Sequence, residues 1–71
     1  MVALNNHLGV RFSLDAERIT VYYNGKELAT KLVGTVLRHF TDWELGGVYL
    51  PYSDVQALKK IIRERQLHGH V

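Results

Sequence analysis

Apolar and polar residues alternate along the front part of the chain. Between positions 8 and 14 every second residue is apolar, with a glycine, an arginine and a serine between them. A period of two is typical of a strand with one buried face, so the pattern predicts a strand over residues 8–14. A second alternating run, rich in β-branched and aromatic residues, predicts a strand over residues 19–23. Residues 15–18 then form the loop of a hairpin.

The middle of the chain supports two predictions. Asn24, followed by Glu27 three residues later, fits the start of a capped helix. Apolar residues then recur in pairs and gather on one side of a helical projection, which favours a helix across this region. The alternative rests on Asn24-Gly25, a strong signal for a two-residue hairpin turn, which would convert residues 26–41 into one or two further strands. The paired apolar residues are Leu28, Ala29, Leu32, Val33, Val36, Leu37 and Phe40.

The last third of the chain reads as a short strand followed by a helix. Residues 48–50 predict the strand, which Pro51 stops because proline cannot donate to a ladder. Ser53 and Gln56 form a Ser-x-x-Gln capping pattern, so the helix is expected over residues 54–66. Its apolar stripe consists of Val55, Leu58, Ile61 and Ile62.

These elements predict an α+β fold in the order β-β-α-β-α, a small domain with a three-stranded sheet and a C-terminal amphipathic helix. The alternative is a four- or five-stranded β-meander plus the C-terminal helix. In both cases residues 1–71 form a single domain and residues 68–71 a flexible tail. Trp43 and Leu45 are expected to cap an edge of the core. The predicted core consists of Val10, Phe12, Ile19, Val21, Val48, Leu50, Val55, Leu58, Ile61 and Ile62, joined by Leu32, Val36 and Phe40 if the middle is helical.

Size and composition favour self-association. The chain has 71 residues, of which 46% are hydrophobic, and contains no cysteine. A domain of this size buries only about 60% of the surface that its unfolded chain exposes, and disulfides cannot compensate here. We therefore expect a homodimer. No apolar run approaches the ~20 residues of a membrane helix, and residues 1–10 lack the pattern of a secretion signal, so we expect a cytoplasmic protein without membrane contact.

The residue types needed for catalysis are present but scattered. The serines, histidines and carboxylates lie outside any recognisable nucleophile turn, and Gly46-Gly47 precedes a strand instead of the helix of a phosphate loop. His68 and His70 are spaced like metal ligands, but the sequence places no third ligand beside them. We therefore expect no enzyme, no metal, no cofactor and no small-molecule substrate.

Two sets of residues are candidates for binding a macromolecule. With the apolar positions turned inward, Arg11, Tyr22 and Tyr49 project from the other face of the sheet, and Trp43 offers a further anchor. Arg, Tyr and Trp are enriched at protein interfaces, so this set predicts a protein partner or a second copy of the chain. Nucleic acid is the alternative, because tyrosines beside an arginine can stack unpaired bases. A basic helix face would serve the same partner through Lys59, Lys60, Arg63 and Arg65.

Residues 48–65, VYLPYSDVQALKKIIRER, resemble the opening of a ribbon-helix-helix repressor. In that family a short strand, a Leu-Pro stop and a capped helix lead to a second helix, whereas this chain ends where that helix is expected. The strand also lacks alternating polar residues that would read base edges, so no function is carried over. We expect a small non-enzymatic accessory or regulatory protein, of a kind common in bacteria and bacteriophages, that acts by binding a protein partner.

Overall fold

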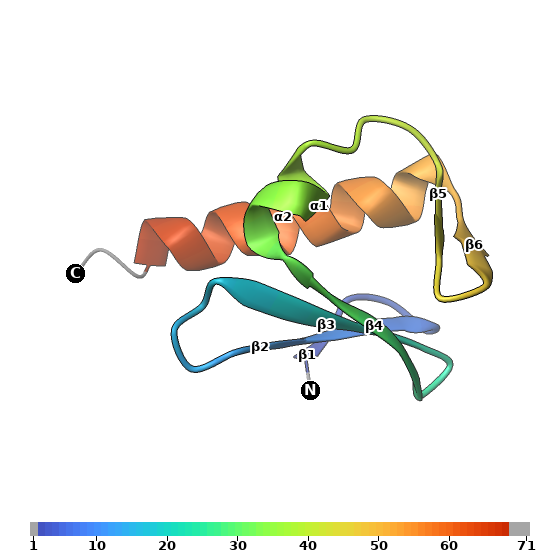
Figure 1. Ribbon diagram of the computed structural model, residues 1–71, viewed down its shortest axis with the longest axis horizontal. Helices are drawn as coiled ribbons and strands as arrows, with labels where there is room; N and C mark the ends of the chain where they lie inside the picture. Colours follow the sequence, from blue (N-terminus) through green and yellow to red (C-terminus); the bar gives the residue numbers. More distant parts are fainter. Residues whose placement is uncertain (1, 69–71) are drawn as a thin grey trace.

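The computed structural model describes residues 2–68 and has two layers, one of sheet and one of helix. Figure 1 shows both helices on one side of a four-stranded sheet, with a separate hairpin beside the N-terminal end of the longer helix. Of the predicted tail, residues 69–71 lie outside the described part of the chain. The elements in order are β1 (Val2–Ala3), β2 (Leu8–Phe12), β3 (Arg18–Tyr23), β4 (Lys26–Leu32), α1 (Val33–Leu37), β5 (Trp43–Leu45), β6 (Val48–Leu50) and α2 (Tyr52–His68).

The four-stranded sheet is an antiparallel meander in the order β1-β2-β3-β4. The predicted hairpin in the front part of the chain is confirmed, with Val10 opposite Val21. Its first strand ends at Phe12, two residues earlier than expected. The Asp15 carboxylate accepts hydrogen bonds from the Ser13 hydroxyl at 2.6 Å and from the Glu17 backbone N–H at 3.1 Å, which turns the chain at this point. Leu14 is therefore exposed in the turn instead of pointing inward.

The predicted middle helix is wrong over residues 26–32, where the structure has β4. This strand and β1, which was not predicted, give the sheet four strands instead of three, the number that the alternative prediction allowed. Asn24 and Gly25 both have positive φ, 53° and 80°, as a two-residue turn of this kind requires. The register between β3 and β4 then shifts, so that Leu28 is an extra residue, and both Leu28 and Ala29 pack against the core. The bulge thus explains why Leu28 and Ala29 are adjacent and both apolar, a pairing that had suggested a helix. Only residues 33–37 are helical.

The strand over residues 48–50 is present, but it belongs to a separate two-stranded sheet. Trp43, predicted in a connection, begins β5 and pairs with Leu50 of β6. The turn of this hairpin lies against the four-stranded sheet: a Cβ atom placed on Gly46 would come within 2.7 Å of the Leu28 carbonyl oxygen. Glycine therefore allows the two sheets to approach each other here.

The core lies between the four-stranded sheet, the β5–β6 hairpin and α2. Most of the predicted core is confirmed, whereas Phe12, Val48 and Ile61 are only partly buried and Leu32 and Phe40 are exposed. Helix α2 begins at Tyr52, so Ser53 lies inside its first turn and not at the N-cap position. The Pro51 carbonyl accepts the backbone N–H groups of Asp54 and Val55. The buried apolar residues are Leu8, Val10, Ile19, Val21, Val33, Val36, Leu45, Leu50, Val55, Leu58 and Ile62.

Candidate partner-binding surface

Three aromatic side chains near the β5–β6 hairpin and the start of α2 are mostly exposed. Phe40, in the loop after α1, is 68% exposed; Tyr49 of β6 is 61% exposed and Tyr52 of α2 is 55% exposed. Single exposed apolar side chains are ordinary on protein surfaces, whereas three large aromatic ones within 13 residues are not. We call Phe40, Tyr49 and Tyr52 the aromatic surface.

Tyr49 projects from the outer side of the β5–β6 hairpin. Its cross-strand partner is Glu44, while Leu45 and Leu50 on the opposite side of the same hairpin are buried. The neighbouring Asp42 carboxylate favours the protonated hydroxyl through hydrogen bonding and so raises the pKa of Tyr49 above its usual value. The tyrosine thus presents an exposed ring on the outer side of the hairpin.

Phe40 is held against α2 although it lies outside helix and strand. Its ring centroid is 4.0 Å from the Nζ atom of Lys59, a cation–π contact. Lys59 itself is only 2% exposed. Tyr52 is seven residues before Lys59, which places both on one side of α2, about 10 Å apart along the helix axis. Phe40 therefore covers a lysine whose stem is buried, and Tyr52 lies farther along the same side of α2.

Trp43 contacts the loop that carries Phe40. Its ring stacks on His39 with centroids 3.7 Å apart and planes inclined by 15°. It is half-buried and packs against the hydrophobic core. The stack connects the loop after α1 to strand β5, so Trp43 positions the loop that carries Phe40.

The residues predicted as one partner-binding set fall on two different sheets. Arg11 and Tyr22 are diagonal neighbours on the face of the four-stranded sheet that the helices do not cover (Figure 1). Trp43 and Tyr49 belong to the β5–β6 hairpin and point to opposite sides of it. Sequence reasoning missed Phe40, which the helical periodicity assigned to the core, and it also missed Tyr52.

The uncovered face of the four-stranded sheet carries mostly polar side chains on its central strands. Thr20 and Thr30 sit opposite each other, and their hydroxyl oxygens are 2.8 Å apart. Arg11 continues this row on β2, and Tyr22 lies opposite Gly9 in the next row. This face offers one aromatic ring, compared with three on the aromatic surface.

The four basic residues predicted on α2 do not share one exposed face. Lys59 is buried, and Lys60 and Arg63 are exposed about 60° apart around the helix. Arg65 lies about 160° from Arg63, and its guanidinium is 4.8 Å from the centroid of the Phe12 ring. An extended nucleic-acid backbone would therefore meet only two of these cations along one line.

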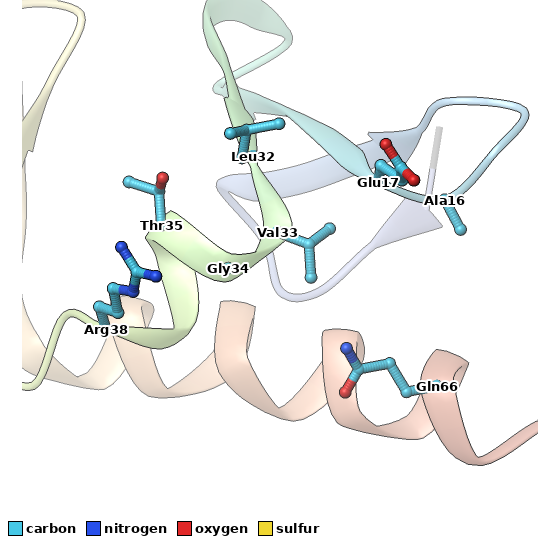
Figure 2. A pocket seen from close by; sticks show the side chains of 8 residues that line it. All are labelled: Ala16, Glu17, Leu32, Val33, Gly34, Thr35, Arg38 and Gln66. Carbon is cyan, nitrogen blue, oxygen red and sulfur yellow. The ribbon is translucent and has the colours of Figure 1, made fainter.

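An open groove of about 400 Å³ lies between the β2–β3 loop, α1 and the C-terminal part of α2. Figure 2 shows Glu17 on the loop side of the groove, Arg38 on the α1 side and Gln66 on α2. None of the residues predicted to bind a partner lines it. One acidic and one basic side chain at its rim give no preference for a charged ligand.

A polar cluster ties the β1–β2 loop to the first turn of α2. Asp54 is 3% exposed, and its two carboxylate oxygens lie 3.1 and 3.0 Å from Nε2 of His7. The Asn5 amide also donates to this carboxylate, at 3.3 Å. The other end of Asn5 accepts the backbone N–H groups of His7 and Leu8. Because every partner is internal, this cluster is fully explained by folding.

Comparisons with known proteins returned no match among protein-family models, curated proteins or solved structures. Within residues 2–68 no helix is long and apolar enough to cross a membrane. Among the described side chains, no three histidine or carboxylate groups come together as metal ligands. The aromatic surface is therefore the feature of the described residues that points most directly to a function.

Proposed function

We propose that this protein is a non-enzymatic accessory or regulatory protein that binds a protein partner through the aromatic surface. The observation that carries the proposal is the exposure of Phe40, Tyr49 and Tyr52 within one short region. Tyrosine is enriched at protein interfaces because it buries a large ring while giving up few side-chain rotamers. The Lys59 ammonium contacts the Phe40 ring before any partner arrives, which lowers the entropic cost of binding at that ring.

Capture from cells of the source organism tests this proposal. The wild-type protein is immobilised beside the variants Phe40→Ser and Tyr49→Ala, whose side chains are mostly exposed, and beside Leu14→Ser, an exposed residue in the β2–β3 turn. We expect a defined partner to be retained by wild type and by Leu14→Ser, and to be lost from both aromatic variants. Equal capture by all four proteins, or capture of nothing, would contradict the proposal.

Self-association is the second part of the proposal, and the uncovered face of the four-stranded sheet is its candidate interface. This face leaves Tyr22 half-buried and Arg11 exposed with no helix over them. Light scattering at high concentration should give about twice the chain mass of 8.2 kDa, and Arg11→Glu should return the protein to the monomer. A monomeric mass for the wild type contradicts the homodimer and leaves the aromatic surface unaffected.

Nucleic acid remains the alternative partner, favoured by the two exposed cations Lys60 and Arg63 on α2. Phosphate contacts of this kind predict weak binding that falls steeply with salt. Fluorescence polarisation with labelled single- and double-stranded oligonucleotides would detect it, and Lys60→Glu with Arg63→Glu should abolish it. Absence of binding at low salt excludes this alternative.

A further inference from the structure

Helix α2 buries two charged side chains on opposite margins of its inward face. Asp54 is 3% exposed and Lys59 is 2% exposed, and they lie about 140° apart around the helix. Asp54 is fully partnered, by His7 and Asn5. For Lys59 the described residues provide neither an ion pair nor a hydrogen bond, and its ammonium is not itself fully buried: it lies 4.0 Å from the centroid of the Phe40 ring and reaches the surface there.

Folding accounts for the stem of Lys59 but does not require its charge. The stem is buried, whereas the ammonium reaches the surface beside the Phe40 ring and has no counter-ion among the described residues. The aliphatic part of the side chain could pack equally well in leucine or methionine, without any charge. Residue 59 therefore places a positive charge on a buried stem, next to the exposed ring of Phe40.

We propose that Lys59 anchors an acidic side chain, Asp or Glu, of the protein partner, and that Phe40 covers this cation in the free protein. The inference rests on the proposed function and deepens it by naming the chemistry of the partner. An ammonium without a counter-ion is complementary to a carboxylate, and charge-assisted hydrogen bonds between them are among the stronger polar contacts. Phe40 lies in a loop and is 68% exposed, so its ring can turn aside without disturbing a helix or strand.

A protein carboxylate fits this site better than a nucleic-acid phosphate. A phosphate backbone is read by a row of cations, whereas Lys59 is a single cation beside the exposed ring of Phe40. Asp42 beside Tyr49 would also repel an extended polyanion. One acidic side chain flanked by an apolar residue would meet both the cation and the Phe40 ring beside it.

The test uses N-acetyl-glutamate N-methylamide as the probe and N-acetyl-glutamine N-methylamide as its neutral control of the same shape. Titration into isotope-labelled protein is followed through the NMR signals of the Lys59 side chain and the Phe40 ring. We expect saturable shifts of both signals with the glutamate probe. The glutamine probe should bind about tenfold more weakly or worse, because it loses a hydrogen bond between two charged groups. Equal shifts with both probes, or none with either, overturn the inference.

Lys59→Met and Lys60→Met form a matched pair of variants, since both remove one positive charge from neighbouring positions of α2 and only Lys59 is buried. Lys59→Met should lose the glutamate-specific shift at Phe40 while Lys60→Met keeps it. Lys59→Met should also unfold at a urea concentration no lower than that of the wild type, because methionine keeps the packing of the stem and removes only an ammonium that has no counter-ion. Loss of binding in both variants, or a marked fall in the unfolding midpoint of Lys59→Met, contradicts the role assigned to Lys59.

This test separates the inference from the proposed function, because the probe needs no partner. If the aromatic variants abolish partner capture and the glutamate probe does not bind, the proposed function stands and the acidic anchor fails. If the probe binds as expected and no partner is captured, the proposed function fails and the carboxylate site remains.

Discussion

The contact between the β5–β6 turn and strand β4 predicts that alanine destabilises the protein more at Gly46 than at the adjacent Gly47. Gly46 and Gly47 both have positive φ, 58° and 83°, so alanine at either position is strained. At Gly46 the added Cβ would also lie 2.7 Å from the Leu28 carbonyl oxygen, whereas at Gly47 nothing lies within 4 Å. Comparing the two variants therefore isolates the steric contact from the conformational strain.

The two variants should lose different amounts of unfolding free energy. A left-handed conformation costs a residue with a Cβ about 1–2 kcal/mol, and this is the whole effect expected for Gly47→Ala. Forcing an extra methyl group against a packed backbone costs a further ~1–3 kcal/mol, so Gly46→Ala should lose about 2–5 kcal/mol. A domain of this length has a free energy of unfolding of roughly 4–11 kcal/mol, so the second loss is a large part of the total.

Urea unfolding, followed by circular dichroism and by Trp43 fluorescence, measures both losses. With an m value of about 1 kcal/mol per molar urea, the midpoint of Gly46→Ala should fall roughly 1–3 M below that of Gly47→Ala. Trp43 is on β5 next to this turn, so its fluorescence reports on the hairpin directly. Equal midpoints for the two variants would refute the close approach of the hairpin to β4, and with it the way in which the hairpin is anchored.

Two further predictions concern the polar contacts. His7→Ala should lower the free energy of unfolding by about 1–3 kcal/mol in urea titrations, because it removes the imidazole that lies 3.0 Å from the buried Asp54 carboxylate. A loss of less than about 0.5 kcal/mol, the median value of a surface ion pair, would show that this pair behaves as solvent-exposed. Asp42→Asn should lower the pKa of Tyr49 towards that of free tyrosine, about 10, which an ultraviolet absorbance titration detects. Because folding raises the pKa of Tyr49, the contact stabilises the fold below pH ~10 and is lost as pH rises through the raised value. An unchanged titration in the Asn variant would show that Asp42 is not the cause.

The candidate surface could be predicted only in part, since burial depends on neighbours that are distant in sequence. Alternation along residues 48–50 placed Tyr49 on the outer side of its strand, and the structure agrees. Lys59 looked like one of several solvated charges on α2, and nothing local indicated that the loop after α1 would cover it. Phe40 shows the opposite error: its helical spacing suggested burial, but the chain leaves the helix three residues earlier, after Leu37.

The sequence by itself determined the elements whose signals are local: the β2–β3 hairpin through its alternation, the Asn24-Gly25 turn through two residues that tolerate positive φ, and α2 through its apolar stripe. Tertiary structure decided between strand and helix for residues 26–32. Pairing with β3 supplies backbone hydrogen bonds, and the bulge at Leu28 lets two adjacent apolar residues reach the core, which an isolated strand pattern does not permit. It also decided that β6 pairs with β5 and not with the main sheet, and that Lys59 is covered by Phe40. The spacing of apolar residues shows which side of a helix or strand is apolar, whereas the element that packs against that side depends on how the whole chain folds.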